Sequence, residues 1–358
     1  MKKLNIAVIG QGRSGRDIHG AYLLTDKAKE KYNVVAIVDK METRRVRALR
    51  EFGCDVYDDY TKLFDRDDID VVVNSTFSYL HYPITKDLLL HGFNVVTEKP
   101  FATHGSECED MIKTAKEAGK IVTVFHQSRL APYYRRIREI MDSGILGDIL
   151  QISLSFSGYA RRWDWQSTNR YGGGGVYNTG PHPIDQAVDL LGTDVMPQIV
   201  YSRLAKVNTF GDADDYAKIL LTAPGKPLVD VEISSCNAYA DYTYKIHGSR
   251  GSLKATLAET DYKYFDPAEA PEQKLILEPL TKDNDGVTPS YCVETLPWKT
   301  VHEKFEGSPF DTAVELYYDK LYDSIVSGAP LFLPPERALQ VIRVAEAVHA
   351  ANPMETIY

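Results

Sequence analysis

The sequence is short of cysteine, of long apolar runs and of basic residues. Its four cysteines (Cys54, Cys108, Cys236 and Cys292) are scattered without CxxC spacing, which predicts reduced thiols in a cytoplasmic protein and neither a disulfide framework nor a metal site. No apolar run approaches the ~20 residues of a transmembrane helix, so no membrane partner is expected. The formal charge of −9 argues against a nucleic-acid partner, because such proteins carry strongly basic surfaces.

The first apolar run, residues 4–9, is predicted to be a β-strand and not a secretory signal. It has only six residues, ends at Gly10 and lacks a cleavage site of small residues.

The length and composition predict two soluble domains. A chain of 358 residues is too long for one ordinary core. Its 44% hydrophobic and 25% charged residues are typical of globular proteins. The pattern changes after Phe125, so we expect one domain over residues 1–125 and a second over residues 126–358. We also expect the last helices to be able to pack back on the first domain.

Strands and helices alternate in the first domain, which predicts an α/β fold. The expected strands are apolar on both faces, as in a doubly wound parallel sheet covered by helices: residues 4–9, 33–38, 69–74, 94–97 and 121–125. The expected helices between them are residues 42–52, 82–91 and 106–118.

The second domain is predicted to be α+β, with an open and mostly antiparallel sheet. Its expected strands follow one another without intervening helices: residues 149–157, 198–207, 217–222, 228–235 and 242–247. Helices are expected over 133–143, 312–327 and 335–350. The polar, proline-containing residues 261–306 are predicted to form an irregular excursion.

A glycine-rich fingerprint directly follows the first strand. Its GxGxxG pattern consists of Gly10, Gly12 and Gly15, with Arg13 and Ser14 between the last two. The glycines permit a tight turn, close approach of a pyrophosphate and close helix packing, which predicts a Rossmann dinucleotide site.

Asp39 ends the second strand, 24 residues after Gly15. A carboxylate at this place binds the adenosine ribose hydroxyls and repels a 2′-phosphate, so NAD is favoured as the cofactor. Lys40, with Arg44 and Arg45 one turn later, leaves NADP possible, although all three also fit solvated charges at the start of a helix.

The segment Glu98-Lys99-Pro100 follows the strand over residues 94–97. The carboxyl edge of a parallel sheet is where open α/β folds bind their ligands. This position indicates a nicotinamide-dependent oxidoreductase with a lysine in its active site.

With these residues, the chain resembles the Gfo/Idh/MocA family, which includes glucose-fructose oxidoreductase and inositol dehydrogenase. The resemblance rests on motifs spread over nearly the whole chain: residues 10–15, 76–81, 98–100, 172–175 and 247–253, with Asn178, His182 and Asp185. It implies two domains of the kinds predicted above and a homodimer or homotetramer.

The resemblance also implies roles for individual residues. Those expected around the nicotinamide end of the cofactor are Thr76, His81, Glu98, Lys99 and Gln127. Lys99 would polarise the reacting oxygen, and His182 would take the hydroxyl proton as a base that titrates near neutrality. For His81, capping of the helix before Pro83 is an equally good interpretation.

Three features depart from the family pattern. Asn178 replaces a common aspartate four residues before the histidine; as an i, i+4 pair on a helix it could hydrogen-bond His182, Lys99 or a sugar hydroxyl. Prolines on both sides of His182 are expected to kink or delay its helix. Phe77 and Ser78 stand where proline and asparagine are frequent.

Asp185 is expected to orient His182 or to contact a hydroxyl, with a structural role equally open.

Aromatic residues before the glycine run form a candidate substrate site. Tyr159, Trp163, Trp165 and Tyr171 could stack on a sugar or cyclitol ring, or could anchor a subunit interface.

Together these features predict an NAD(P)-dependent oxidoreductase that acts on a secondary alcohol of a sugar, sugar derivative or inositol. Two alternatives stay open: a redox-assisted glycosidase or glycoside oxidase on the same scaffold, and a non-catalytic nucleotide-sensing protein.

Overall fold

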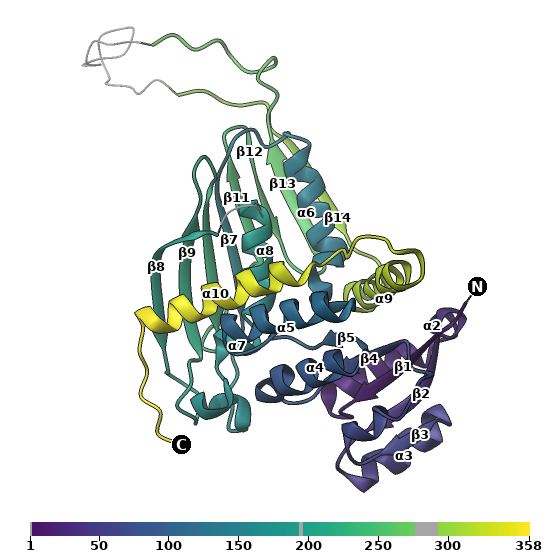
Figure 1. Cartoon of the computed structure of the whole chain (residues 1–358). Helices are drawn as coiled ribbons and strands as arrows, with labels where there is room; N and C mark the ends of the chain where they lie inside the picture. Colours follow the sequence, from purple (N-terminus) through teal and green to yellow (C-terminus); the bar gives the residue numbers. More distant parts are fainter. Residues whose placement is uncertain (1, 193–195, 276–292) are drawn as a thin grey trace, which may run out of the picture.

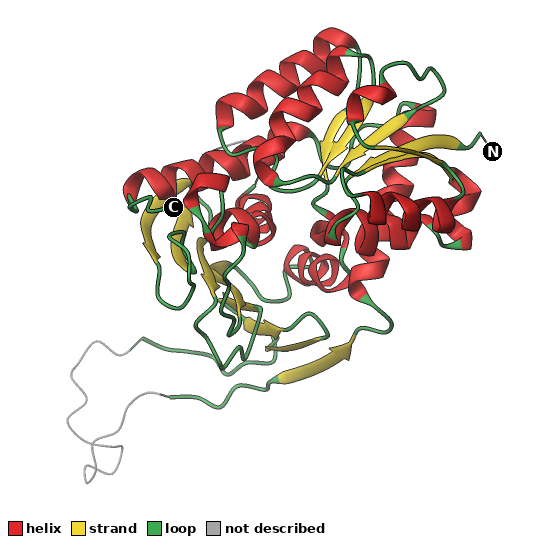
Figure 2. Ribbon diagram, turned by 90° about the horizontal axis from the view of Figure 1, so that it is seen from below, coloured by secondary structure: helices red, strands yellow, loops and turns green. Residues whose placement is uncertain are grey.

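A computed structural model describes residues 2–192, 196–275 and 293–358. Two β-sheets organise these residues, one near each end of the molecule in Figure 1. Helices cover both faces of the first sheet, as the view from below shows (Figure 2). No helix in the described ranges has the length and apolarity needed to span a bilayer.

The N-terminal sheet is parallel and has the strand order β3-β2-β1-β4-β5-β6. This is the order of a dinucleotide-binding Rossmann fold, so the predicted α/β class is confirmed. Its strands are β1 (Leu4–Ile9), β2 (Tyr32–Val38), β3 (Asp55–Tyr57), β4 (Val71–Asn74), β5 (Asn94–Thr97) and β6 (Val122–Val124). The prediction missed β3, which has only three residues and lies at the edge of the sheet.

Four of the helical segments up to residue 142 were predicted and match α3, α4, α5 and α6 to within one residue, whereas the six shorter segments were not predicted. The bounds of all these segments are η1 (Arg13–Gly20), α1 (Ala21–Leu23), α2 (Asp26–Lys31), α3 (Glu42–Phe52), η2 (Tyr60–Leu63), η3 (Ser78–Leu80), α4 (His81–Leu90), α5 (Gly105–Ala118), η4 (Gln127–Leu130) and α6 (Pro132–Asp142). Helix α5 ends at Gly119, which takes a left-handed conformation with φ of 63°.

The C-terminal sheet is mixed and mostly antiparallel, as predicted, with the order β14-β13-β12-β11-β7-β10-β9-β8. Only β7 and β10 pair in parallel among its described strands. The strands are β7 (Ile149–Ser157), β8 (Gln198–Ala205), β9 (Tyr216–Thr222), β10 (Leu228–Ser234), β11 (Tyr244–Gly248), β12 (Gly251–Ala255), β13 (Glu259–Tyr264) and β14 (Lys299–Lys304). The face that carries Val231 packs under α8 (Pro181–Leu191) and α10 (Pro335–Ala351), while the opposite face carries an ion pair between Lys218 and Asp230 at 2.8 Å.

The prediction of an irregular excursion over residues 261–306 was wrong at both ends. Strands β13 and β14 pair with each other in this segment. β14 is the edge strand and β13 is its neighbour. Both are rich in charged residues, so they lack the apolar alternation that identified the other strands. Residues 276–292, which include Cys292, lie outside the described residues; the other three cysteines are free thiols.

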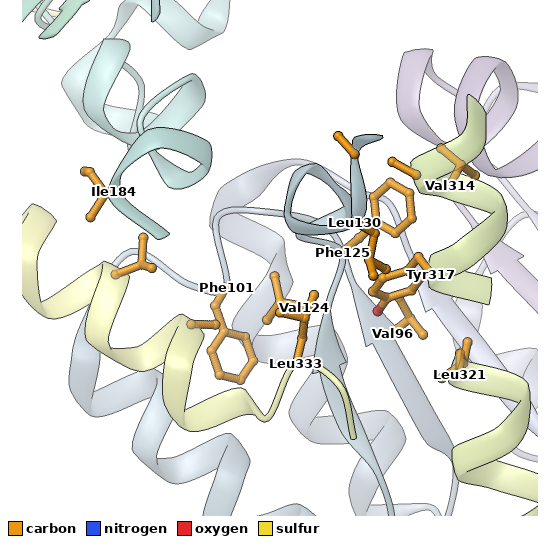
Figure 3. Close-up of a cluster of buried hydrophobic side chains, with 14 of the residues drawn as sticks. Val96, Phe101, Val124, Phe125, Leu130, Ile184, Val314, Tyr317, Leu321 and Leu333 are labelled. Carbon is orange, nitrogen blue, oxygen red and sulfur yellow. The ribbon is translucent and has the colours of Figure 1, made fainter. Parts of the chain in front are cut away.

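Helices α9 (Pro309–Ser327) and α10 pack against the N-terminal half. Figure 3 shows Tyr317 of α9 beside Phe125, with Leu333 below Val124. The rings of Phe125 and Tyr317 meet edge to face at 4.7 Å, and the Phe125 side chain is 1% exposed. The chain therefore returns to the first sheet after building the second.

Replacing Phe125 should test the weight of this contact. We expect Phe125→Ala to lower the free energy of unfolding by about 3–5 kcal/mol, because it opens a cavity between α9 and β6. Phe310→Ala, in helix α9, is the control. The Phe310 side chain is 43% exposed, so its replacement should lower the free energy of unfolding by about 1 kcal/mol or less. Urea unfolding followed by circular dichroism measures both, and equal losses would contradict the packing described here.

Candidate active site

The glycine-rich turn forms a cradle at the carboxyl end of β1. Gly10 has φ of 92° and donates its N–H to the Val38 carbonyl at 2.7 Å. A Cβ at Gly10 would lie 2.6 Å from the Ser75 carbonyl oxygen, and one at Gly15 would clash with the Gly10 carbonyl. A Cβ at Gly12 would meet only the tip of Arg44, at 3.8 Å. Gly10 and Gly15 are thus required by the fold, whereas Gly12 leaves open space at the start of η1, where Arg13 and Ser14 lie.

Asp39 is held firmly at the end of β2. Its Oδ2 accepts the Gln11 N–H at 2.7 Å, and its Oδ1 accepts the Met41 N–H at 2.8 Å. Arg44 makes an ion pair with the same carboxylate at 3.3 Å. Arg45 instead donates to the carbonyls of Asp39 and Lys40, whose own side chain is exposed. Of the three cations noted in the sequence, only Arg44 neutralises Asp39.

Lys99 lies at the end of β5 and reaches across to the C-terminal half. Its Nζ donates to the main-chain carbonyl of Asn178 at 2.7 Å. Burial lowers the pKa of the Lys99 amine below its usual range, and the Glu98 carboxylate only partly offsets this. The charges of Arg13 and Arg162 lower the same pKa further.

Glu98 is buried beneath Lys99 and remains ionised. Its carboxylate accepts the Lys99 N–H at 3.0 Å and contacts His19 Nε2 at 3.2 Å. Burial alone raises the pKa of Glu98, but the hydrogen bond from His19 and the charge of Lys99 lower it to about 2. The sequence did not predict a role for His19, because it lies 79 positions from Glu98 and no local pattern connects the two residues.

Thr76 and His81 hold the loop after β4. Thr76 Oγ1 donates to Asn74 Oδ1 at 2.7 Å. His81 Nδ1 donates to the Pro100 carbonyl at 2.6 Å, and its Nε2 lies 3.3 Å from the Thr76 carbonyl. Burial lowers the pKa of His81. The ring therefore ties the Thr76 loop to the Lys99 loop, and neither of the two predicted roles describes this contact.

The helix expected around His182 is interrupted. Helix α7 (Gly175–Asn178) ends before Pro181, where α8 begins, so the expected delay by proline is present. The expected i, i+4 pairing of Asn178 and His182 on one helix is wrong, because Asn178 ends α7 and His182 lies in α8. The side-chain oxygen of Asn178 instead accepts a hydrogen bond from Gln166 Nε2 at 3.1 Å. The His182 N–H bonds to the Thr179 carbonyl, which leaves the Asn178 carbonyl available to Lys99.

His182 faces the same region from the start of α8. Its Nδ1 lies 3.1 Å from Ser128 Oγ. Burial lowers the pKa of the His182 ring, and the charge of Lys99 and the ring of His126 lower it further, to about 3. The imidazole is therefore neutral at physiological pH, unlike the base titrating near neutrality that the sequence suggested.

Asp185 belongs to a buried ion cluster. Its carboxylate lies 2.8 Å from Arg129 Nε and 3.5 Å from His126 Nδ1. Arg129 also pairs with Asp189 at 2.9 Å. Burial raises the pKa of Asp185, but the charge of Arg129 outweighs this, so the pKa is lowered overall. Arg129, which the sequence analysis missed, thus binds the carboxylate expected to orient His182.

Two buried amide oxygens at the carboxyl edge have no hydrogen-bond partner within the described ranges. They are Gln11 Oε1, in the glycine-rich turn, and Gln127 Oε1, after β6. Together with the open space at Gly12, they fit a polar, phosphate-containing cofactor lying along this edge.

The predicted aromatic residues divide into two groups. Trp165 meets Phe77 edge to face at 5.1 Å, and Tyr171 packs on Tyr79 at 5.1 Å. In contrast, Tyr159 is 65% exposed and Trp163 is 81% exposed. The aromatic cluster of Phe77, Tyr79, Trp165 and Tyr171 therefore joins loops of both halves, while Tyr159 and Trp163 lie outside it.

A pocket with mostly polar lining residues lies beside Asn178 and holds about 400 Å³ of empty space, counted with its opening to solvent. Most of its lining residues can hydrogen-bond, and they include Arg162, Gln166, Thr179, Thr209, Ser234 and Ser235. Asp215, also in the lining, accepts three main-chain N–H groups at 2.6–2.8 Å. The cavity thus presents hydroxyls, amides and one arginine next to the Lys99 contact.

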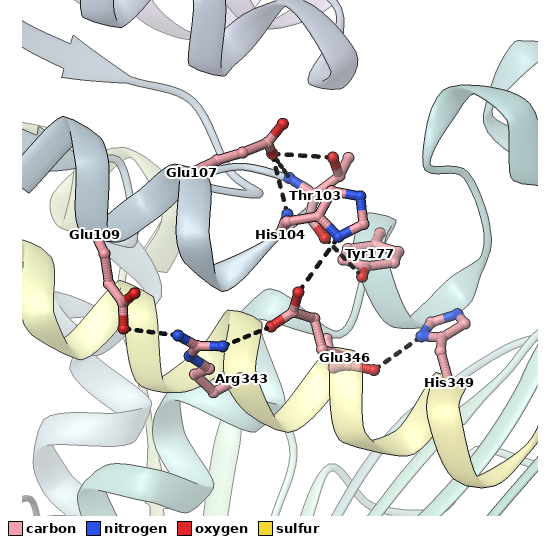
Figure 4. Close-up of polar contacts among 9 residues, drawn as sticks. Thr103, His104, Glu107, Glu109, Tyr177, Arg343, Glu346 and His349 are labelled. Carbon is pink, nitrogen blue, oxygen red and sulfur yellow. Dashed lines mark hydrogen bonds and ion pairs between the residues drawn. The ribbon is translucent and has the colours of Figure 1, made fainter.

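Helix α10 packs against α7, the short helix that ends at Asn178. His349 stacks on Tyr177 at 4.9 Å, and Tyr177 donates its hydroxyl to the Thr103 carbonyl at 2.9 Å. Figure 4 shows these contacts beside the pair of His104 with Glu346. The loops after Lys99 and before His182 are thereby tied to one helix.

The half-buried imidazole of His182 should make stability depend on pH. Between its folded pKa of about 3 and its unfolded value of 6.5, the unfolded chain binds more protons, so His182 weakens the fold as pH falls through this range. We expect His182→Gln to spare roughly 2 kcal/mol of the stability that the wild type loses between pH 6.5 and about 4.5. Urea unfolding at both pH values measures this, and parallel losses in the two proteins would contradict it.

Comparison with known proteins agrees with this geometry. An oxidoreductase family model with an NAD-binding Rossmann fold matches residues 4–126, and the Gfo/Idh/MocA C-terminal domain matches residues 134–254. The scyllo-inositol 2-dehydrogenase (NADP(+)) of Bacillus subtilis is 26% identical, over 96% of this chain and 92% of that protein. The 2,7-anhydro-N-acetylneuraminate hydratase of Mediterraneibacter gnavus is also 26% identical, over 72% and 69%.

Solved structures share the whole fold. The oxidoreductase yvaA of Bacillus subtilis superposes with a TM-score of 0.77 at 23% identity, covering 98% of this chain and 97% of that one. The WlbA dehydrogenase of Bordetella pertussis, in complex with NADH and UDP-GlcNAcA, gives 0.74 at 19% identity, covering 98% and 96%. The chain therefore belongs to the Gfo/Idh/MocA family of oxidoreductases, and its N-terminal half is an NAD-binding Rossmann domain.

Proposed function

We propose that this protein transfers hydride between nicotinamide and a secondary alcohol carbon of a sugar, sugar derivative or inositol. The observation that carries the proposal is the Lys99 amine, which is held at the carboxyl edge of the Rossmann sheet by Asn178, a residue of the polar cavity. An amine at this place contacts both the nicotinamide end of the cofactor site and a chamber suited to hydroxyl groups.

The cofactor is assigned to the edge that runs from Asp39 to Gln127. Asp39 would bind the adenosine ribose, and the N–H groups at Gly12, Arg13 and Ser14 would bind the pyrophosphate. The nicotinamide end would lie near Thr76 and Glu98, with His81 holding the loops around it. When bound, NAD supplies the hydride acceptor or donor.

Two side chains are assigned to the reacting hydroxyl. Lys99 donates a hydrogen bond to the oxygen, and its lowered pKa lets it exchange a proton more readily than an ordinary lysine. His182 is neutral and accepts a hydrogen bond from the same hydroxyl or from its neighbour. In oxidation the hydroxyl proton would leave to the Lys99 amine, with His182 as a hydrogen-bond acceptor, while the hydride would pass from the same carbon to the nicotinamide, so charge and electrons balance. The main-chain carbonyl of Asn178 positions Lys99. Asp185 fixes helix α8 in place through its ion pair with Arg129.

The substrate class follows from the cavity and from the relatives. Hydroxyl and amide side chains match a polyol, and the aromatic cluster offers ring faces through Trp165 and Tyr171. One relative is named for scyllo-inositol and another for an anhydro sugar acid. Tyr159 and Trp163 are exposed enough to serve a larger substrate or the predicted homodimer or homotetramer contact.

A redox-neutral reaction at the same site is the second candidate. It is favoured by the relative named as a hydratase. Transient oxidation of one ring hydroxyl would acidify the neighbouring C–H, allow elimination and addition of water, and end with return of the same hydride. Such a reaction would show substrate conversion without net NADH in a progress curve.

Replacing the amine tests the catalytic assignment. Once a substrate is found by screening inositols and aldoses with NAD, we expect Lys99→Met to lower kcat by about 10²–10⁴-fold. Its Kd for NADH should change by less than about threefold, since the pyrophosphate and ribose contacts remain. Lys113→Met is the control, because Lys113 is an exposed lysine of α5. An unchanged kcat in Lys99→Met would remove lysine from the mechanism.

The choice between NAD and NADP depends on Asp39 and its partner Arg44. We expect NADH to bind more tightly than NADPH, because Asp39 retains a free lone pair for the ribose and opposes a 2′-phosphate. Arg44→Ala should widen this preference by about tenfold, since it removes the cation that would attract the phosphate. Fluorescence titration with each nucleotide measures both; tighter NADPH binding by the wild type would show that Arg44 overrides Asp39.

A further inference from the structure

A buried hydrogen-bonded chain leads from α9 to the cofactor edge. Tyr318 Oη lies 2.8 Å from His19 Nδ1, and His19 Nε2 lies 3.2 Å from Glu98 Oε1. The other carboxylate oxygen accepts the Lys99 N–H at 3.0 Å. Tyr318 and His19 are fully buried, and Glu98 is 4% exposed. Neither Tyr318 nor His19 has a part in the proposed reaction.

The partners fix where the protons lie. Tyr318 Oη has His19 as its hydrogen-bond partner in the described structure, so its O–H donates to Nδ1. The Nε2–H then donates to Glu98, and Glu98 accepts from both sides. The imidazole thus connects the tyrosine hydroxyl to the carboxylate, which also accepts the main-chain N–H of Lys99. The chain therefore holds the Glu98 carboxylate by hydrogen bonds from two sides, which stabilise its ionised form.

The topology places that charge at one particular end of the cofactor site. The adenosine ribose is assigned to Asp39 at the end of β2, and the pyrophosphate to the glycine-rich turn after β1. In a sheet of this order the dinucleotide crosses the switch point between β1 and β4, so its nicotinamide half lies over β4 and β5. Glu98 directly follows β5.

We propose that Tyr318 and His19 are positioning residues that keep Glu98 anionic at the nicotinamide end, so that the site binds the oxidised, cationic nicotinamide in preference to the reduced, neutral one. This inference rests on the cofactor placement in the proposed function. A fixed anion in a buried site discriminates between the two ring charges because the low local dielectric strengthens their interaction.

The opposing charge at this end is that of Lys99. Burial and two arginines lower the pKa of its amine, so Lys99 gives up its proton more readily than an exposed lysine and then no longer offsets Glu98. Tyr318 lies in α9, a helix near the C-terminus that packs against the first domain. The packing of α9 would thereby influence the cofactor's redox preference without touching the cofactor.

The test compares the dissociation constants for NAD+ and NADH, measured by isothermal titration calorimetry without substrate. We expect His19→Leu to lower the preference for NAD+ over NADH by about tenfold, since a hydrogen bond to a charged group is lost. Tyr318→Phe, which keeps the ring packing, should lower it by about threefold. His19→Gln places an amide N–H near Nε2 and should restore most of the preference.

Tyr322→Phe is the matched control. Tyr322 lies in the same helix and donates its hydroxyl to the Lys2 carbonyl at 2.7 Å, away from Glu98. It should leave the ratio of the two constants unchanged. If Tyr318→Phe and His19→Leu weaken both nucleotides equally, the two residues are merely structural and the inference fails while the cofactor assignment stands. If the folded wild type binds neither nucleotide, both are overturned.

Discussion

The arrangement of the site depends on the hydrogen bond from Lys99 Nζ to the main-chain carbonyl of Asn178. This bond is available only because the polypeptide between α7 and α8 is not a regular helix. Pro181 has no N–H, and His182 donates to the Thr179 carbonyl, so the Asn178 carbonyl is left without a helical donor. A lysine from one half of the molecule supplies that donor, and the two halves are held in register at the point where the chemistry is proposed.

Behind each proposed catalytic side chain lies a buried carboxylate that another element keeps ionised. Glu98, behind Lys99, is held by His19, and Asp185, behind His182, is held by Arg129. Leaving either carboxylate without its partner would strand a buried charge, which is far more costly than losing a surface pair. The two networks therefore constrain the backbone at the ends of β5 and α8 more strongly than local hydrogen bonds would.

The sequence was sufficient where a feature is local and insufficient where it depends on distant partners. The parallel strands and the GxGxxG turn were predicted because apolar runs and glycine spacing are visible in short windows. Strands β13 and β14 were not, because they consist mostly of polar and charged residues and bury little apolar surface. The same limit applies to the site: Lys99 follows from its position after a strand, whereas Arg129 acquires its role only when folding brings α8 beside it. The prediction that His182 titrates near neutrality was wrong for the same reason, since the burial and the neighbouring charges that lower its pKa come from other elements.

Phe77, one of the residues that depart from the family pattern, has a physical explanation in the aromatic cluster. Phe77 stands in the loop after β4, and its ring meets Trp165 of the C-terminal half edge to face. Tyr79 stacks on Phe77 and also contacts Tyr171. Such pairs contribute about 0.5–1.5 kcal/mol each beyond the area they bury, so the loop assigned to the nicotinamide end and the loop assigned to the substrate are stabilised as one unit. A change in either loop would then alter the other, so Phe77 of the Rossmann domain is coupled through Trp165 to the loop proposed to bind the substrate.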